Sequence, residues 1–218
     1  MIETRLFDLK RSIAQRLFES AEYPWEALDM LGEYIRRVGK GLDKELYEEW
    51  GREIWVAKSA SVSCSAILKA PLIIEEDSLI GCNAYLGGAV IIGRRAVVGN
   101  SSEVRRSVLF EGARASSRNY ISDSVIGYNA SLGAGAIISN IRADRGEVVC
   151  ALFGDAVGSG RKRFGALVGD GAEIGCSSIL TAGSVIEAGA RVNPLTRVRG
   201  NVTADRTYKG EKILSDIL

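Results

Sequence analysis

Residues 74–104, IEEDSLIGCNAYLGGAVIIGRRAVVGNSSEV, carry the pattern that decides the fold. A branched aliphatic residue recurs at every sixth position of this stretch: Ile74, Ile80, Leu86, Ile92, Val98 and Val104. The same spacing begins at Val56 and, after an interruption, resumes over residues 168–198. The step shortens to five residues at two places: Val104 to Leu109 and Ile121 to Ile126. A period of six fits neither an amphipathic helix nor the alternation of a hairpin sheet, so another architecture is required.

The spacing predicts a chain that coils as a triangular prism, in which each hexapeptide forms one flat face and one corner. The aliphatic residue points inward on every face, and glycine, asparagine or aspartate accommodates the positive φ angle that the corners require. Three hexapeptides complete one coil, and successive coils pair as parallel strands about 4.8 Å apart. Cys64 is expected to lie over Cys82 as a packing contact rather than a disulfide. The predicted fold is an all-β solenoid, a parallel β-helix over residues 56–200, followed by a tail over residues 201–218 with a short helix at 212–218.

Residues 1–55 have a helical pattern instead. Pro24 opens an apolar stripe at helical spacing that ends at Gly39. Residues 46–50 suggest a further short helix. Earlier aliphatic residues predict a helix before Pro24: Leu6, Leu9, Ile13 and Leu17. We expect this segment to dock as a small helical cap or arm on the first coil, because that coil otherwise exposes its strand edges.

Residues 140–165, NIRADRGEVVCALFGDAVGSGRKRFG, interrupt the repeat. A loop of this length that leaves a regular solenoid is usually functional or disordered. Its entry, NIRAD, and its basic exit, SGRKRFG, make it the candidate wall of a site. The alternative is an excursion that serves only contacts between subunits.

The composition excludes several classes of protein. The 218 residues include 28 basic and 27 acidic side chains and no histidine. The lack of histidine removes Ser-His-Asp triads, histidine-ligated metals and any histidine general base. The four cysteines show no zinc-site spacing, and no apolar run is long enough to cross a membrane. The N-terminus lacks the apolar region of a secretory signal, so a cytoplasmic protein with reduced thiols is expected.

Basic residues gather in the second half of the chain, where residues 104–200 hold 12 basic and 8 acidic side chains. Many of them lie near turns or in the interruption: Arg105, Arg106, Arg114, Arg118, Arg142, Arg145, Arg161, Lys162 and Arg163. Such a field attracts small anions such as phosphates, although a solvated charged surface would look the same in the sequence. Nucleic acid is not an expected partner, because no aromatic residues interleave the basic cluster.

A family resemblance rests on residues 103–144, EVRRSVLFEGARASSRNYISDSVIGYNASLGAGAIISNIRAD, and on KRFGA at residues 162–166. These segments closely resemble the β-helical acetyltransferase domain of the glucosamine-1-phosphate acetyltransferase / UDP-N-acetylglucosamine pyrophosphorylase family. The resemblance implies a left-handed β-helix, a homotrimer with sites between adjacent prisms, acetyl-CoA as acyl donor, and a sugar phosphate or nucleotide sugar as acceptor. It covers about the last two-thirds of the chain.

The chain departs from that family in two ways. The position of the family's catalytic histidine falls on Ser117, and the nucleotidylyltransferase half has no counterpart here. Residues 1–55 are too few for a nucleotide-binding fold, so pyrophosphorylase activity is not expected. Acetyl transfer is the first hypothesis. The alternative is a catalytically inactive β-helix that binds a sugar nucleotide or acts as a trimeric scaffold.

Three residues are candidates for catalysis: Ser117, Asp123 and Asn140. Ser117 occupies the histidine position, but a hydroxyl needs an activating base. Asn140 can orient the acceptor or hold the oxyanion, and Asp123 either takes part in the chemistry or satisfies backbone N–H groups at a corner. The resemblance places Tyr120 at a substrate-site position, beside the matched neighbours Arg118 and Asn119, although Tyr120 could also serve only in packing. Arg142 is a candidate for contact with the phosphates of CoA or of a sugar phosphate.

A further set of residues is expected to contact the acyl donor. Arg161, Lys162 and Arg163 suit the phosphates of CoA or of a sugar phosphate, since guanidinium binds phosphate in bidentate fashion. The alternative is a solvated basic loop. Small residues are expected to leave room for the pantetheine arm: Gly165, Ala166 and Ala188.

Overall fold

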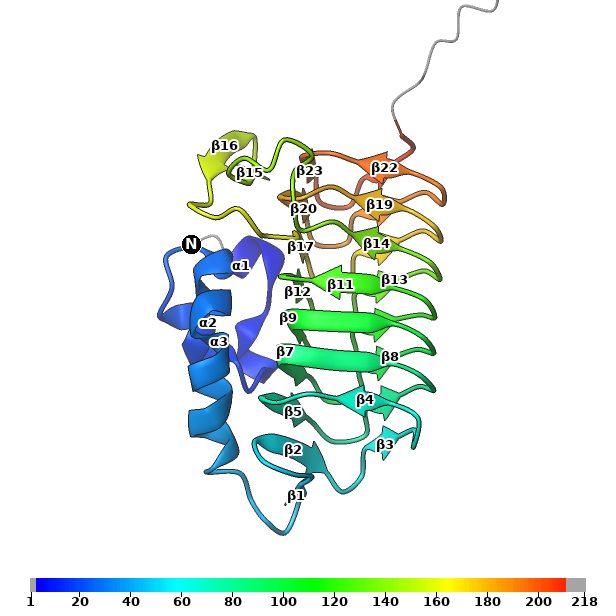
Figure 1. The fold of residues 1–218 in the computed structure, drawn as a ribbon. Coiled ribbons are helices and arrows are strands. Elements are labelled where there is room, and N and C mark those ends of the chain that lie inside the picture. The colour runs from blue at the N-terminus through cyan, green and yellow to red at the C-terminus, as the bar shows by residue number, and fades with distance from the viewer. Residues whose placement is uncertain (1–2, 211–218) are drawn as a thin grey trace, which may run out of the picture.

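The computed structural model describes residues 3–210, which form a β-solenoid with short helices packed along one side (Figure 1). The coils are those of a parallel β-helix, as the six-residue spacing predicts, and the helix is left-handed, as the family resemblance implies. Strands stack in parallel from coil to coil, so each side of the prism is a column of short strands. Two strand pairs are antiparallel instead, one at the start of the solenoid and one in the excursion.

Three faces make up the prism. The helix-covered face contains β2 (Ile54–Ala57), β5 (Leu72–Ile74), the second halves of β7 (Tyr85–Ile92) and β9 (Glu103–Leu109), β12 (Val125–Ile126), β17 (Ala166–Val168), β20 (Ser184–Ile186) and β23 (Asn201–Val202). The open face contains β4 (Ile67–Leu68), the first halves of β7 and β9, β11 (Tyr120–Ser122), β14 (Ile137–Ile138), β19 (Ile179–Leu180) and β22 (Arg197–Val198). The third face contains β3 (Ser61–Val62), β6 (Leu79–Ile80), β8 (Val97–Val98), β10 (Arg114–Ala115), β13 (Ser131–Leu132), β18 (Glu173–Ile174), β21 (Arg191–Val192) and β24 (Thr207–Tyr208).

The aliphatic column predicted from the six-residue spacing forms the core of the solenoid. Its members from Ile74 to Val198 are buried in one cluster, and Val62 and Leu68 of the first coil are partly buried against it. Alanines four residues after many of these positions fill the inner corners: Ala84, Ala96, Ala113, Ala130, Ala136, Ala172 and Ala190. Every coil therefore adds the same buried contact to the next, which is how a solenoid without a globular core is stabilised.

The helices lie along the whole helix-covered face, and the predicted docking on the first coil holds only for the end of α3 (Pro24–Gly39), where Gly39 packs on Trp55 and Arg36 pairs with Glu53. The other helical elements are α1 (Glu3–Leu6), the 3₁₀ turn η1 (Leu9–Arg11) and α2 (Gln15–Glu19). The strands of this face are apolar on both sides, and their outward residues are buried against Phe18, Trp25 and their neighbours. These outward residues come from coils along the length of the prism: Ile73, Ile91, Val108, Val125, Leu167 and Val185. Burying this apolar surface favours a position along the face.

Of the other predictions for the N-terminal segment, one is confirmed and two are not. The helix from Pro24 to Gly39 is confirmed. The helix predicted over residues 6–17 is interrupted, because Asp8 leaves the helical path and its backbone N–H donates to the Asp170 carboxylate at 2.6 Å. Residues 46–50 are not helical: β1 (Tyr47–Glu49) pairs antiparallel with β2 and covers its edge. The first coil is thus protected by a strand where the sequence suggested a helix.

At the other end the coils continue beyond the predicted boundary at residue 200, since β23 pairs with β20 and β24 pairs with β21. The helix predicted at 212–218 lies outside the described residues. Within residues 3–210 every helix is too short or too polar to span a bilayer.

A buried carboxyl group lies at the corner between the helix-covered and third faces. Glu75 is 4% exposed. Burial, reinforced by the neighbouring charge of Glu76, raises the pKa of Glu75 from 4.5 to about 7, and Arg94 opposes this shift. Glu111, two coils further along the prism, adds further negative charge. The folded protein therefore holds a proton on Glu75 at pH values where the unfolded chain releases it.

This proton makes stability depend on pH in a defined direction. Between pH 4.5 and 7 the folded state binds more protons than the unfolded chain, so the free energy of unfolding falls as the pH rises. Raising the pH from 5 to 8 should lower the free energy of unfolding of the wild type by roughly 2–3 kcal/mol more than that of a Glu75→Gln variant. Urea unfolding of both proteins at the two pH values measures this difference. Parallel pH dependences would contradict it.

Candidate functional site

A pocket of about 470 Å³ lies at the corner between the open face and the helix-covered face. It is lined by Gly87, Gly88, Glu103, Arg105, Arg106, Tyr120, Ser122, Asp123, Asn140 and Arg163. Four of these residues were predicted from the sequence: Tyr120, Asp123, Asn140 and Arg163. A second hollow near the end of α3, lined in part by Lys40, Lys44 and Arg52, contains none of the predicted residues.

Every irregularity of the repeat falls on this corner. Both five-residue steps cross it, because the turn after Val104 and the turn after Ile121 connect the open face to the helix-covered face. The excursion leaves and re-enters at the same corner. The shortened steps place Arg106 and Asp123 one coil apart in left-handed turns, with φ of 39° and 53°. The corner is therefore built differently from the others and presents charged side chains.

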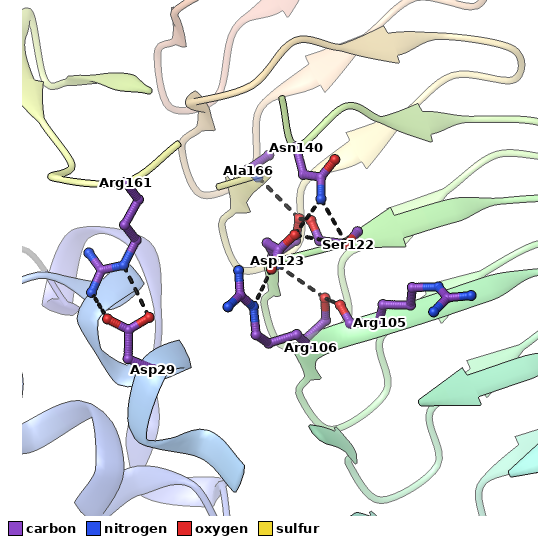
Figure 2. A network of polar contacts seen from close by, with 10 residues as sticks. Asp29, Arg105, Arg106, Ser122, Asp123, Asn140, Arg161 and Ala166 are labelled. Atoms are coloured by element: carbon purple, nitrogen blue, oxygen red, sulfur yellow. Dashed lines mark hydrogen bonds and ion pairs between the residues drawn. The ribbon is translucent and has the colours of Figure 1, made fainter. Parts of the chain in front are cut away.

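Asp123 is the centre of the polar network in the pocket (Figure 2). Its side chain is 6% exposed and forms an ion pair with Arg106 through Oδ1. Oδ2 accepts hydrogen bonds from the Ser122 hydroxyl at 2.9 Å and from Asn140 Nδ2 at 2.5 Å. Both carboxylate oxygens are thus occupied by donors, as a buried charge requires.

This network fixes the direction of the Asn140 amide. Its Nδ2 donates to Asp123 and, at 3.2 Å, to the Ser122 hydroxyl. Because a carboxylate only accepts, the atom that faces Asp123 is the nitrogen. Both N–H groups are then used, and Oδ1 lies on the side away from Asp123 (Figure 2). Within residues 3–210 no group donates to Oδ1, so Asn140 offers the pocket an acceptor and cannot serve as an oxyanion donor.

The three arginines of the pocket differ in their partners. Arg105 pairs with Glu103 and lies over the Tyr85 ring, with its Cζ 4.4 Å from the ring centroid. Arg106 is held by Asp123. Arg163 forms no ion pair with any residue between 3 and 210, and it is exposed. It is the guanidinium that remains available to an anionic ligand.

Three predicted residues lie at a different corner. Ser117, Arg118 and Asn119 precede β11, whereas Asp123 follows it, so the strand separates them from the pocket. The Asn119 side chain is buried and donates to the carbonyl oxygens of Gly133 at 2.7 Å and Ala136 at 3.2 Å, which gives it a structural role in the coil. The structure does not bring Ser117 to the Asp123 network.

The remaining basic candidates also lie outside the pocket. Arg142 is paired with Asp144 inside the excursion, with Nε 2.9 Å from Oδ1. This pairing lowers the pKa of the Asp144 carboxyl well below its usual range. Arg161 is paired with Asp29 of α3. Lys162 is exposed.

The groove expected for the donor's pantetheine arm is filled by protein where the excursion returns. Gly165 and Ala166 are buried. A Cβ at Gly165 would lie 2.1 Å from Ser124 Oγ and 2.2 Å from the Ser122 carbonyl oxygen, so glycine is required for close packing. Ala188 lies partly buried at another corner of the prism.

The sequence reading missed Ser122, Glu103 and the Gly87–Gly88 turn as pocket residues. It placed Arg105 and Arg106 only in a general basic field. A signal was present: counting along the coils shows that both five-residue steps and the excursion share one corner, which would have placed Arg106 beside Asp123.

Known proteins agree with this description. Residues 68–164 match the GMPPB C-terminal domain family. The bifunctional sugar-1-phosphate nucleotidylyltransferase/acetyltransferase of Sulfurisphaera tokodaii is 31% identical over 196 residues, which is 81% of this chain and 49% of that protein. The bifunctional protein GlmU of Methanococcus maripaludis is 33% identical over 117 residues, 48% of this chain and 28% of that protein. This chain thus spans at most about half the length of these relatives.

Solved structures with a weak similarity to this chain are also found. One is the S84A mutant of AntD, an N-acyltransferase from Bacillus cereus, in complex with dTDP-4-amino-4,6-dideoxyglucose and coenzyme A. It is 17% identical, with a TM-score of 0.42 over 78% of this chain and 83% of that chain. By these sequence matches the chain is similar to the GMPPB C-terminal domain family and to the bifunctional sugar-1-phosphate nucleotidylyltransferase/acetyltransferases.

Proposed function

We propose that this chain transfers an acetyl group from acetyl-CoA to the amine of a sugar phosphate or nucleotide sugar bound in the corner pocket. The observation that carries the proposal is the fixed Asn140 amide, whose free Oδ1 can accept a hydrogen bond from an amine. Arg163, which has no ion-pair partner within residues 3–210, supplies a guanidinium for the acceptor's phosphate. The acetyltransferase relatives support the reaction class.

In this mechanism the amine nitrogen attacks the thioester carbonyl, a C–N bond forms, and the C–S bond breaks to release the thiolate of CoA. Asn140 orients the nitrogen lone pair by accepting one of its hydrogens. Asp123 holds Asn140 and Arg106 in place and, with both oxygens occupied, does not take the proton. The chain contains no histidine, so the proton passes to water. An amine suits such a site, since part of it is unprotonated near neutral pH.

Substitution of Asn140 tests where the chemistry takes place. Asn140→Ala removes the acceptor that aligns the amine and should lower kcat/KM about 100-fold, whereas Ser117→Ala should change it less than about twofold. The assay follows thiol release from acetyl-CoA with a panel of amino-sugar phosphates that includes glucosamine 1-phosphate. A loss on Ser117→Ala equal to that on Asn140→Ala would move the site to the family's histidine position.

The pH dependence tests the lack of an enzymic base. The logarithm of kcat/KM should rise with a slope near one up to the pKa of the acceptor amine, because only the free amine attacks. Two acceptors whose amines differ in pKa should give profiles displaced by that difference. A profile with the same midpoint for both acceptors would indicate a titrating protein group and contradict the mechanism.

A binding or scaffold role is the second candidate, favoured by the absence of histidine and by the distance of Ser117 from the network. It predicts that the protein binds glucosamine 1-phosphate or a nucleotide sugar in calorimetry and releases no thiol with any acceptor. Thiol release that depends on Asn140 would exclude it.

We further infer that copies of this chain assemble as a homotrimer through the open face. Outward side chains on neighbouring strands form a partly apolar ladder there: Ile67, Tyr85, Glu103, Tyr120, Ile137, Ile179 and Arg197. Ile67, Ile137 and Ile179 are 51%, 41% and 41% exposed. Glu103 and Tyr120 of this ladder also line the pocket, so a neighbouring copy on this face would close the pocket's open side.

Charge placed on the ladder tests the assembly. The double variant Ile137→Glu, Ile179→Glu should dissociate the trimer, because assembly would then bury two unpaired carboxylates in place of apolar side chains. Light scattering coupled to size-exclusion chromatography should show monomers. Leu79→Glu is the matched control, since Leu79 is 46% exposed on the third face. A monomeric wild type, or equal dissociation of the control, would rule out this interface.

A further inference from the structure

The exit of the excursion is fastened to the N-terminal helix α3 by one ion pair. Arg161 donates through Nε to Asp29 Oδ1 at 3.2 Å and pairs through Nη2 with Asp29 Oδ2, a bidentate contact (Figure 2). Its third nitrogen, Nη1, donates to the Ser159 carbonyl oxygen at 2.9 Å. The Arg161 side chain is 19% exposed, so the pair is partly shielded from solvent. This contact joins segments that lie 132 residues apart.

Apolar packing beside the ion pair joins the same two segments. The rings of Trp25 in α3 and Phe164 in the exit have centroids 5.6 Å apart. Val148 and Cys150 of the excursion are buried in the cluster that contains Trp25. Burial raises the pKa of Cys150 to about 12, so its thiol packs as a neutral group. The hairpin of β15 (Val149–Leu152) and β16 (Asp155–Gly158) packs on β20 of the solenoid and contacts α1 where Arg5 lies over the Phe153 ring, so the excursion rests on both the coils and the helical segment.

The fastened exit leads directly into the pocket. Arg163, which lines the pocket, lies between Arg161 and the residues that return to the solenoid. Phe164 donates its backbone N–H to the Asn140 carbonyl oxygen at 3.0 Å, and Gly165 donates to that of Asp123 at 2.8 Å. The chain around Arg163 is therefore held on one side by the pocket backbone and on the other by α3.

We propose that Asp29 and Arg161 are positioning residues, which hold the excursion exit so that the Arg163 guanidinium stays in the pocket to bind the acceptor's phosphate. This inference rests on the proposed function, because it assigns Arg163 to an anionic substrate. The helical segment then has a role beyond covering an apolar face: it sets the affinity of a site that none of its own residues line. Since Arg163 would contact the phosphate in ground state and transition state alike, loosening it should raise KM and leave kcat unchanged.

The test compares Asp29→Asn with the charge-reversed pair Asp29→Arg, Arg161→Asp. Asp29→Asn should raise KM for the amino-sugar phosphate about tenfold with kcat unchanged, and should weaken glucosamine 1-phosphate binding in calorimetry by the same factor. Amide hydrogen exchange at Val148 and Ser159, whose N–H groups bond within the excursion, should become faster. The reversed pair should restore slow exchange and much of the affinity.

Asp144→Asn is the matched control, because it breaks the other bidentate arginine pair of the excursion without touching α3. It should leave KM, binding and exchange at these two amides unchanged. Faster exchange in Asp29→Asn with unaltered binding would overturn the positioning role, as would a fall in kcat at constant KM, which indicates a smaller folded fraction. Wild-type binding of a sugar phosphate or nucleotide sugar without thiol release from any acceptor of the panel would overturn the proposed acetyl transfer and leave the positioning role standing. A wild type that binds no member of the panel would overturn both.

Discussion

The inward stacking of one aliphatic residue per face is the constraint on which the rest of the structure depends. Each side chain packs on its equivalents in the coils above and below, and the parallel hydrogen bonds between coils hold that alignment. Because the column tolerates no shift in phase, any change in chain length must be absorbed at a corner. The two five-residue steps and the long excursion meet this requirement, since each begins and ends on a correctly placed aliphatic residue.

The pocket forms because these changes in chain length all occur at the same corner of the prism. Shortening the same corner in consecutive coils brings Arg106 against Asp123, and the excursion above supplies Asn140 and Arg163. A buried carboxylate with three donors is stable there because each donor is itself held by a coil or by its neighbour. In the proposed function, the roles left to this pocket are acceptor alignment by Asn140 and anion binding by Arg163. This is a simpler site than one with a histidine base, and it matches a chain that contains none.

The sequence was most informative at positions where only one type of residue satisfies the local structural requirement. Aliphatic residues at intervals of six can only fill the column, and Pro24 and Gly39 mark helix ends, so the solenoid and α3 were predictable. It was less informative where partners are distant. The apolar triplet Leu72–Ile74 signals a strand buried on both sides, but not that helices cover it. Ser117 was chosen by alignment with a family position, whereas the direction of the Asn140 amide depends on Ser122 and Asp123 together.

The return of the excursion at Gly165 has a consequence for how such proteins diversify. The return point admits no Cβ, so its backbone is locked to Ser122 and Ser124 of the coil below. Between the entry at Asn140 and this locked return, however, the chain makes no coil of the solenoid. The length of that stretch can therefore change without shifting the phase of the rungs, as long as the residues that pack on the helix-covered face are kept.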